Sequence, residues 1–182
     1  MKKALILTTL ISSMVVAETS NTYINMNQVL LTHSENGTVN DFQPTAFQWT
    51  LGHIVKDFHY LLIGVEGSLM LGVRNDVKSS TQSSQSGAFT NATTTLDKLY
   101  NVNIKAILPI IHDLSATTYL GVSRAKMLST ATNYTSRNVW DNSFSYGVGL
   151  EYQLLSKVSV HADYMKYFKN LDAIEFGIGF KF

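Results

Sequence analysis

The last ten residues of the chain alternate between large apolar side chains and small or charged ones. Successive side chains of an extended strand point to opposite faces, so one face of this segment is fully apolar. That face carries Ile174, Phe176, Ile178, Phe180 and Phe182. An edge strand with such a face would promote aggregation in water unless something apolar covered it. A lipid bilayer would cover it, and the length is also suitable, because a tilted membrane strand needs about 9 to 11 residues.

The same period of two recurs in seven earlier segments of the chain. We predict strands over residues 23–31, 46–54, 59–73, 99–108, 117–127, 144–154 and 158–168, followed by 173–182. The faces of the first strand stay open, because Asn25, Asn27 and Gln28 blur its pattern. Those of the fifth stay open because Arg124 and Lys126 continue its apolar face. No helical periodicity follows the first residues, so the sequence predicts an all-β protein with eight strands.

The connections between these strands alternate in length. Residues 32–44, 74–95 and 129–142 are rich in polar and turn-forming residues and are expected to be long loops. The links over residues 55–58, 109–116, 155–157 and 169–172 are short. Transmembrane barrels have short periplasmic turns and longer extracellular loops. If both chain ends are periplasmic, the long loops lie outside the cell.

The amino terminus has the pattern of a secretory signal peptide. Lys2 and Lys3 form a basic start, a short apolar stretch follows, and Val15 and Ala17 occupy the small-residue positions before a cleavage site. The apolar stretch is too short to span a membrane as a helix. We therefore expect a cleavable signal peptide over residues 1–17 and a single barrel domain over residues 18–182.

Charge and cysteine content exclude several classes of function. Removal of Lys2 and Lys3 leaves 12 basic and 13 acidic residues, so nucleic-acid binding has no electrostatic support. The chain contains no cysteine, which excludes a disulfide-stabilised scaffold, thiol chemistry and a lipoprotein anchor.

Alternation alone does not distinguish a membrane barrel from a soluble, lipocalin-like barrel, because both need two opposite faces. Glycine weakens a strand and has no purpose on a surface exposed to water. The interior of an eight-stranded barrel is just wide enough to be filled by side chains, so glycines there leave room for larger polar groups. We therefore expect the polar face to point inward. Its glycines are Gly52, Gly64, Gly121, Gly147, Gly149, Gly177 and Gly179.

Residues 144–152, Phe-Ser-Tyr-Gly-Val-Gly-Leu-Glu-Tyr, lead through a tight turn to Ala162-Asp163-Tyr164, and the chain ends on Phe182. From about residue 23 to residue 182 it resembles the eight-stranded outer-membrane β-barrel family that includes the OmpA transmembrane domain, OmpX and Ail-type adhesins. The resemblance implies an eight-stranded antiparallel up-and-down transmembrane β-barrel in the outer membrane of a Gram-negative bacterium. It also implies that the barrel-assembly machinery reads a C-terminal signal made of Phe176, Ile178, Phe180 and Phe182.

The inward face is predicted to hold a polar network, because buried charges must be paired or neutralised. Its members are Glu66, Lys105, Glu151, His161, Asp163 and Glu175. One interpretation is a satisfied polar core that plugs the barrel. Another is a switchable ion-pair gate between Glu66 and Lys105 that gives a small conductance.

Ser159, His161 and Asp163 share the inward face and invite a hydrolase hypothesis, since lipid A deacylases use Ser and His on a barrel of this size. Positions two apart lie roughly 6 to 7 Å from each other along one strand, which is beyond hydrogen-bond reach. We therefore predict no catalytic site. The five histidines show no ligand spacing, so no metal or other cofactor is expected.

The favoured function is a small outer-membrane barrel that acts as a membrane-embedded scaffold, with surface-exposed loops for envelope integrity or surface interaction. The alternatives are a narrow, low-conductance channel and, third, a lipid-modifying enzyme. Expected partners are outer-membrane lipid, lipopolysaccharide and the barrel-assembly machinery, with any surface ligand unknown and the protein a monomer. Arg74, Lys78, Lys126 and Arg137 could meet lipopolysaccharide phosphates.

Overall fold

The computed structural model describes residues 21–33, 45–74, 77–78, 92–131 and 134–182. These residues form strands and short turns. The strands are β1 (Thr22–His33), β2 (Thr45–Asp57), β3 (Leu62–Arg74), β4 (Val77–Lys78), β5 (Ala92–Ile111), β6 (Leu114–Ala131), β7 (Tyr134–Leu155), β8 (Val158–Phe168) and β9 (Leu171–Lys181). The predicted signal peptide, residues 1–17, lies outside the described residues.

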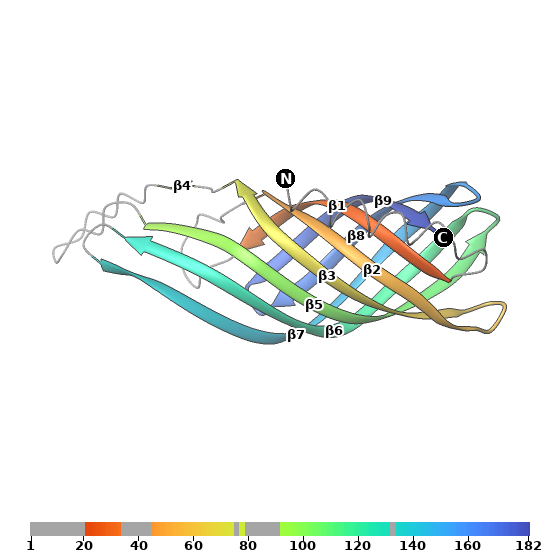
Figure 1. Ribbon diagram of the computed structural model, residues 1–182, viewed down its shortest axis with the longest axis horizontal. Helices are drawn as coiled ribbons and strands as arrows, with labels where there is room; N and C mark the ends of the chain where they lie inside the picture. The colour runs from red at the N-terminus through yellow and green to blue at the C-terminus, as the bar shows by residue number, and fades with distance from the viewer. Residues whose placement is uncertain (1–20, 34–44, 75–76, 79–91, 132–133) are drawn as a thin grey trace, which may run out of the picture.

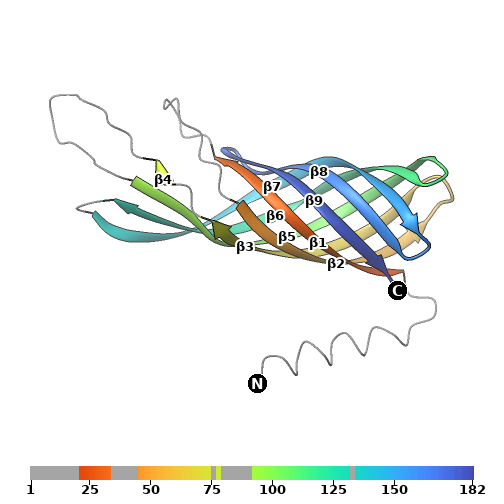
Figure 2. The same cartoon turned by 90° about the horizontal axis from the view of Figure 1, so that it is seen from above.

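All strands except the two-residue β4 form one closed antiparallel wall (Figures 1 and 2). Each wall strand pairs with the next along the chain, β4 being passed over by a direct pairing of β3 with β5. β1 and β9 close the ring, with Tyr23 opposite Lys181 and Leu30 opposite Ile174. The predicted eight-stranded up-and-down barrel is therefore confirmed.

The start of β1 and the end of β9 lie at the same end of the barrel, which the register of Tyr23 with Lys181 fixes. Three short links return the chain at this end, over residues 58–61, 112–113 and 156–157. We call it the periplasmic end, because short turns of membrane barrels lie in the periplasm, and the opposite one the extracellular end.

The link between β2 and β3 is displaced from its predicted position. β2 continues to Asp57, and β3 begins only at Leu62, so residues 55–57 are strand rather than link. The turn depends on His59, which has a φ of 72°. Its backbone N–H donates to Asp57 Oδ1 over 2.7 Å, which stabilises a left-handed conformation that a histidine otherwise seldom adopts.

The prediction of a polar loop over residues 129–142 is wrong. β6 runs on to Ala131 and β7 begins at Tyr134, with Ser129 opposite Arg137 and Arg124 opposite Asn142. β7 pairs with β8 only from Tyr146 onward. The extracellular parts of β5, β6 and β7 therefore extend beyond the rest of the wall as a projecting sheet, visible in Figures 1 and 2. A polar segment can remain in strand conformation where a neighbouring strand pairs its backbone groups.

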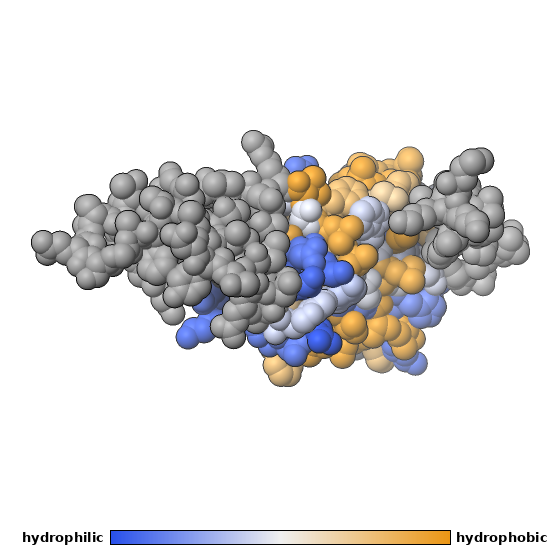
Figure 3. Space-filling view, turned by 60° about the vertical axis from the view of Figure 1, so that its left-hand side comes forward, coloured by the Kyte–Doolittle hydropathy of each residue, from blue (hydrophilic) through white to orange (hydrophobic). Residues whose placement is uncertain are grey.

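Side chains of the wall alternate between lipid and interior as predicted. In β9, Ile174, Phe176, Ile178 and Phe180 are exposed, whereas Glu175 is only 4% exposed. On the face shown in Figure 3, apolar residues cover much of the wall and hydrophilic ones lie mostly along its borders. Within the described ranges, no helix has the length and apolar character needed to cross a membrane.

The structure also assigns the faces that the sequence left open. Asn25 and Asn27 point into the barrel and Gln28 points outward, while Arg124 is exposed on the outer face of β6. One residue departs from the alternation of β8: the period of two places Phe168 on the outward face with Tyr164, but it is buried beside Tyr167. An irregularity in the pairing of β8 with β9 between Lys166 and Phe168 breaks the alternation there.

Candidate functional site

The barrel interior is divided along its axis into three zones. A polar vestibule of about 240 Å³ occupies the periplasmic end. An ionic layer in the middle contains the six predicted network residues and their hydrogen-bond partners. An apolar plug fills the extracellular end, and its residues are Val29, Leu31, Ala46, Met70, Leu96, Leu99, Ala125, Met165, Phe168, Leu171 and Ala173.

Lys105 on β5 is the cation at the centre of the ionic layer, and it is 1% exposed. Its Nζ lies 3.4 Å from Glu66 Oε1 on β3 and 3.0 Å from Glu151 Oε2 on β7. The same ammonium group lies 5.0 Å from the ring centre of Tyr23 and 5.5 Å from that of Tyr119. Two carboxylates and two aromatic faces therefore replace the water that this buried charge has lost.

Three of the buried carboxylates each accept a hydrogen bond from a tyrosine hydroxyl. Tyr23 donates to Glu66 over 2.7 Å, and Tyr119 donates to Asp163 over 3.0 Å. Tyr167 donates to Glu175. Each tyrosine ring also fills interior volume. The pairs therefore give each carboxylate a hydrogen-bond donor and at the same time pack the lumen.

The carboxamides of Asn27 and Gln48 connect the remaining polar groups. Asn27 Nδ2 donates to Gln48 Oε1 over 2.7 Å and to Glu175 Oε2 over 3.1 Å. Gln48 Nε2 in turn donates to the Tyr167 hydroxyl over 2.9 Å. Asn27 Oδ1 lies 2.9 Å from His161 Nε2, which joins the histidine to the network.

Two inward glycines permit this close packing. A Cβ at Gly177 would collide with Asn27 Oδ1 and His161 Nε2, and one at Gly149 would collide with Asp163 Oδ1. A larger residue at either position would displace the network. The glycines of the inward face thus leave room for polar side chains, as the sequence suggested.

The vestibule brings Lys105, Glu151 and Ser159 within reach of the periplasm. Lys157 and Lys181 line it as well, and both are exposed at its mouth. A second cavity, of about 20 Å³, lies inside the ionic layer and is lined by Glu66, Asp163 and Glu175 among others. Its size suits a single water molecule.

All six predicted network residues lie in the interior, and the structure joins them into two neighbouring groups. Glu66 and Glu151 meet at Lys105, while Glu175 and His161 meet at Asn27. Asp163 Oδ2 lies 3.7 Å from His161 Nε2, at the edge of the second group. The tyrosines and carboxamides of the network were not predicted, although Tyr23, Asn27 and Gln48 lie on the inward faces of their strands.

The Ser159, His161 and Asp163 row does not form a nucleophilic triad. His161 Nε2 faces Asn27, and its Nδ1 has no partner within the part of the chain that the structure describes. Among the same residues, no group of three or more His, Asp or Glu side chains could hold a metal ion.

A basic and aromatic cluster lies on the outer face of β5, β6 and β7, where these strands begin to project beyond the rest of the wall. Tyr100 stacks on Trp140 at 6.3 Å, and the Arg124 guanidinium lies 4.7 Å from the Trp140 ring centre. Lys126 Nζ lies 3.1 Å from Asp97 Oδ2, and Lys98 is its register partner. We call Lys98, Tyr100, Arg124, Lys126 and Trp140 the rim cluster.

Comparison with solved structures gives barrels of the same architecture. Ail, the attachment invasion locus protein of Yersinia pestis, superposes with a TM-score of 0.62 at 15% identity, covering 90% of this chain and 99% of that one. Neisserial surface protein A gives 0.54 at 15% identity, covering 90% and 98%. The N-terminal barrel of Pseudomonas aeruginosa OprF gives 0.53 at 10% identity, covering 90% and 98%. At these identities the likeness shows the fold alone.

A search of curated proteins found no match. The sequence profile of the outer membrane protein beta-barrel domain, in contrast, matches residues 4–182, which is nearly the whole chain. The chain therefore belongs to the outer membrane protein β-barrel domain family and is a small barrel protein of the Gram-negative outer membrane.

Proposed function

We propose that this protein is a non-enzymatic scaffold of the outer membrane, whose extracellular end supports envelope integrity or surface interaction. The observation that carries the proposal is the apolar plug, whose residues are at most 7% exposed and belong, with Tyr119 and Tyr167, to one cluster of buried residues. Among the residues that the structure describes, such a close-packed apolar cluster offers no polar route through the extracellular half of the lumen. We therefore assign the activity to the outer wall and to the projecting sheet of β5, β6 and β7.

The rim cluster supplies the chemistry for a contact with lipopolysaccharide. Guanidinium and ammonium groups pair well with phosphate, and tryptophan and tyrosine favour the membrane interface. Lys98, Arg124 and Lys126 lie on the outer wall where the projecting sheet leaves it, and we place the outer-leaflet head groups at this level. The Ail barrel has been solved with the heparin analogue sucrose octasulfate, so a protein of this fold can hold a polyanion.

A triple variant tests this proposal. Replacement of Lys98, Arg124 and Lys126 by alanine is expected to lower the lipopolysaccharide that co-purifies with the barrel and to sensitise cells to detergent. A matched variant, Lys56→Ala with Lys157→Ala, removes exposed charges at the periplasmic end and should change neither. Unchanged lipopolysaccharide retention in the triple variant would refute the lipid contact.

The same geometry argues against the two other functions considered. A channel would need water to pass Leu31, Met70 and Leu99, all of them at most 1% exposed. A lipid-modifying enzyme would need a nucleophile that meets an acyl chain, but Ser159 and His161 are buried inside the wall.

The C-terminal assembly signal remains part of the proposal. Phe176, Ile178 and Phe180 are exposed on the outer wall, and the Phe182 backbone N–H donates to the Thr22 carbonyl over 3.0 Å at the seam of the barrel. An apolar row along the closing strand is available to assembly factors before β1 and β9 pair. Deletion of Phe182 should lower the amount of folded barrel without changing the stability of what does fold.

A further inference from the structure

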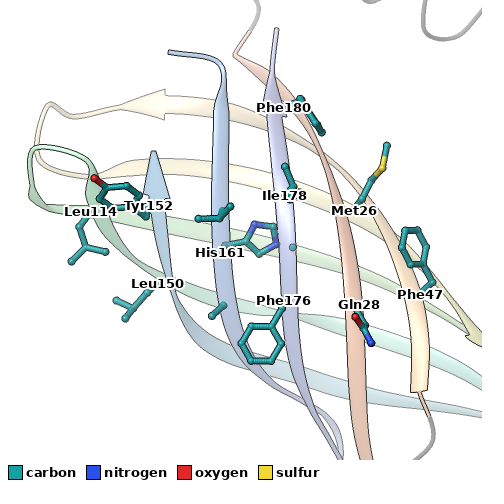
Figure 4. Close-up of a pocket in the computed structure, with 13 residues that line it drawn as sticks. Met26, Gln28, Phe47, Leu114, Leu150, Tyr152, His161, Phe176, Ile178 and Phe180 are labelled. Atoms are coloured by element: carbon teal, nitrogen blue, oxygen red, sulfur yellow. The ribbon is translucent and has the colours of Figure 1, made fainter. Parts of the chain in front are cut away.

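Gln28 places a polar carboxamide in the apolar belt of the outer wall. It lies on β1, six residues from Thr22 and five from His33, and its side chain is exposed. Its register partners are Phe47 on β2 and Phe176 on β9. The outward residues before and after it on β1 are Met26 and Leu30. All four neighbours in the sheet are apolar, as Figure 4 shows for three of them.

The Gln28 carboxamide makes no hydrogen bond within the part of the chain that the structure describes. An amide that is left unpaired in hydrocarbon is costly, because lipid tails offer neither donors nor acceptors. A lipid head group does not solve the problem. Gln28 lies roughly 15 to 20 Å along the strand from either end of β1, which at a tilt of about 40° is roughly 12 to 15 Å of depth and places it near the middle of the hydrocarbon layer.

An apolar groove of about 790 Å³ adjoins this carboxamide on the same outer face (Figure 4). It exists because Ala162 on β8 is small, whereas its register partners Leu150 on β7 and Phe176 on β9 are large. Met26, Gln28 and Phe47 form its border on the other side of β9. A hollow beside a ridge of aromatic side chains is a shape into which the ridge of another barrel can pack.

We propose that this face is the interface of a homodimer, in which Gln28 of one copy meets Gln28 of the other. A primary carboxamide carries both donors and an acceptor, so two of them related by a twofold axis satisfy each other. Such self-complementarity selects a second copy of this chain over an acyl chain, which could fill the groove but not pair the amide. The inference departs from the monomer expected from the sequence.

Cysteine crosslinking in intact outer membranes tests the proposal, because the native chain has no cysteine. Met26→Cys places a thiol beside Gln28 without removing the amide. Val122→Cys, which is 54% exposed on β6 across the barrel, is the matched control. Mild oxidation should give a disulfide-linked double-mass species for Met26→Cys and little for Val122→Cys.

The role of the amide is tested in the Met26→Cys background. Gln28→Leu should lower the dimerisation constant about three- to thirtyfold, which corresponds to the loss of one or two hydrogen bonds between membrane segments. Gln28→Asn, which keeps the amide, should retain more of the dimer. A heat-modifiability gel verifies that each variant is a folded barrel.

Three results would overturn the dimer. The first is that crosslinking at position 26 is no faster than crosslinking at position 122. The second is that Gln28→Leu leaves the crosslinking of the Met26→Cys variant unchanged. Native mass spectrometry could also show a monomer that carries one phospholipid and loses it on Gln28→Leu, which would assign the groove to lipid.

Discussion

At the scale of single residues, the interior depends on one cation. Within the described chain, Glu66, Glu151, Asp163 and Glu175 place four carboxyl groups in the ionic layer, and Lys105 is the lysine that compensates them. An ion pair of this kind adds little net stability compared with apolar packing, but removal of the cation leaves the carboxylates in the interior without a counter-ion.

Lys105→Met should therefore be strongly destabilising, by about 3 to 5 kcal/mol, because Glu66 and Glu151 lose their counter-ion. The free energy of unfolding can be measured by urea titration in lipid vesicles, with tryptophan fluorescence as the signal. Lys157→Met, at an exposed turn, is the control and should stay near the parent. A Lys105→Met variant as stable as the parent would show that the pair is dispensable.

A pair of glycines gives a second residue-scale prediction. A Cβ at Gly177 meets Asn27 and His161, whereas one at Gly67 has no atom within 4 Å. Gly177→Ala should cost about 1 to 3 kcal/mol through overpacking. Gly67→Ala should be neutral or slightly stabilising, because alanine restricts the unfolded chain. Equal melting temperatures for the two variants would contradict this account.

The charged residues of the ionic layer could be named from the sequence, because the period of two places Glu66 and Lys105 on the inward faces of their strands. Their partners could not. Tyr23 reaches Glu66 across 43 positions of the chain, and Asn27 reaches Glu175 across 148. Which side chains meet in a barrel depends on strand register and tilt, and the sequence of a single strand determines neither.

At the scale of elements, β9 offers two positions at which the same substitution should destabilise the barrel to different degrees, because they lie at different depths in the membrane. Phe176 lies in the middle of the strand, level with Gln28, whereas Phe180 lies one residue before its end. Phe176→Arg should destabilise the barrel by about 2 to 4 kcal/mol, and Phe180→Arg by about 0 to 1 kcal/mol.

Urea unfolding in vesicles of defined thickness measures both variants of β9. Similar losses at the two positions would mean that β9 does not cross the bilayer along its length. The exposed Val148 on β7 offers a control on a different strand, because Val148→Ile should change little.

The projecting ends of β6 and β7 are the elements that the sequence misjudged. Residues 129–142 are mostly polar at odd and even positions alike, so no alternation was available to identify them as strand. The strand conformation there comes from backbone pairing, such as Ser129 with Arg137 and Lys126 with Trp140. The polarity of a segment reflects the solvent or lipid around it, whereas backbone pairing with neighbouring strands determines its conformation.

At the scale of the whole molecule, the plug makes the barrel a closed body. We expect the parent protein to give no steady conductance in a planar bilayer. A triple variant with Leu31, Met70 and Leu99 changed to serine should admit water into the extracellular half and give a measurable current. Conductance in the parent equal to that of the variant would show that the plug does not seal the lumen.

The sequence by itself determined the architecture, because lipid on one side and a crowded interior on the other impose a period of two on every spanning strand. It also identified the charged groups that must lie inside. The tertiary structure decided the rest: the register that joins Lys105 to Glu66 and Glu151, the concentration of apolar residues at one end of the lumen, and the position of Gln28 among aromatic neighbours. These features arise between strands, so they depend on how the sheet closes and not on any single segment.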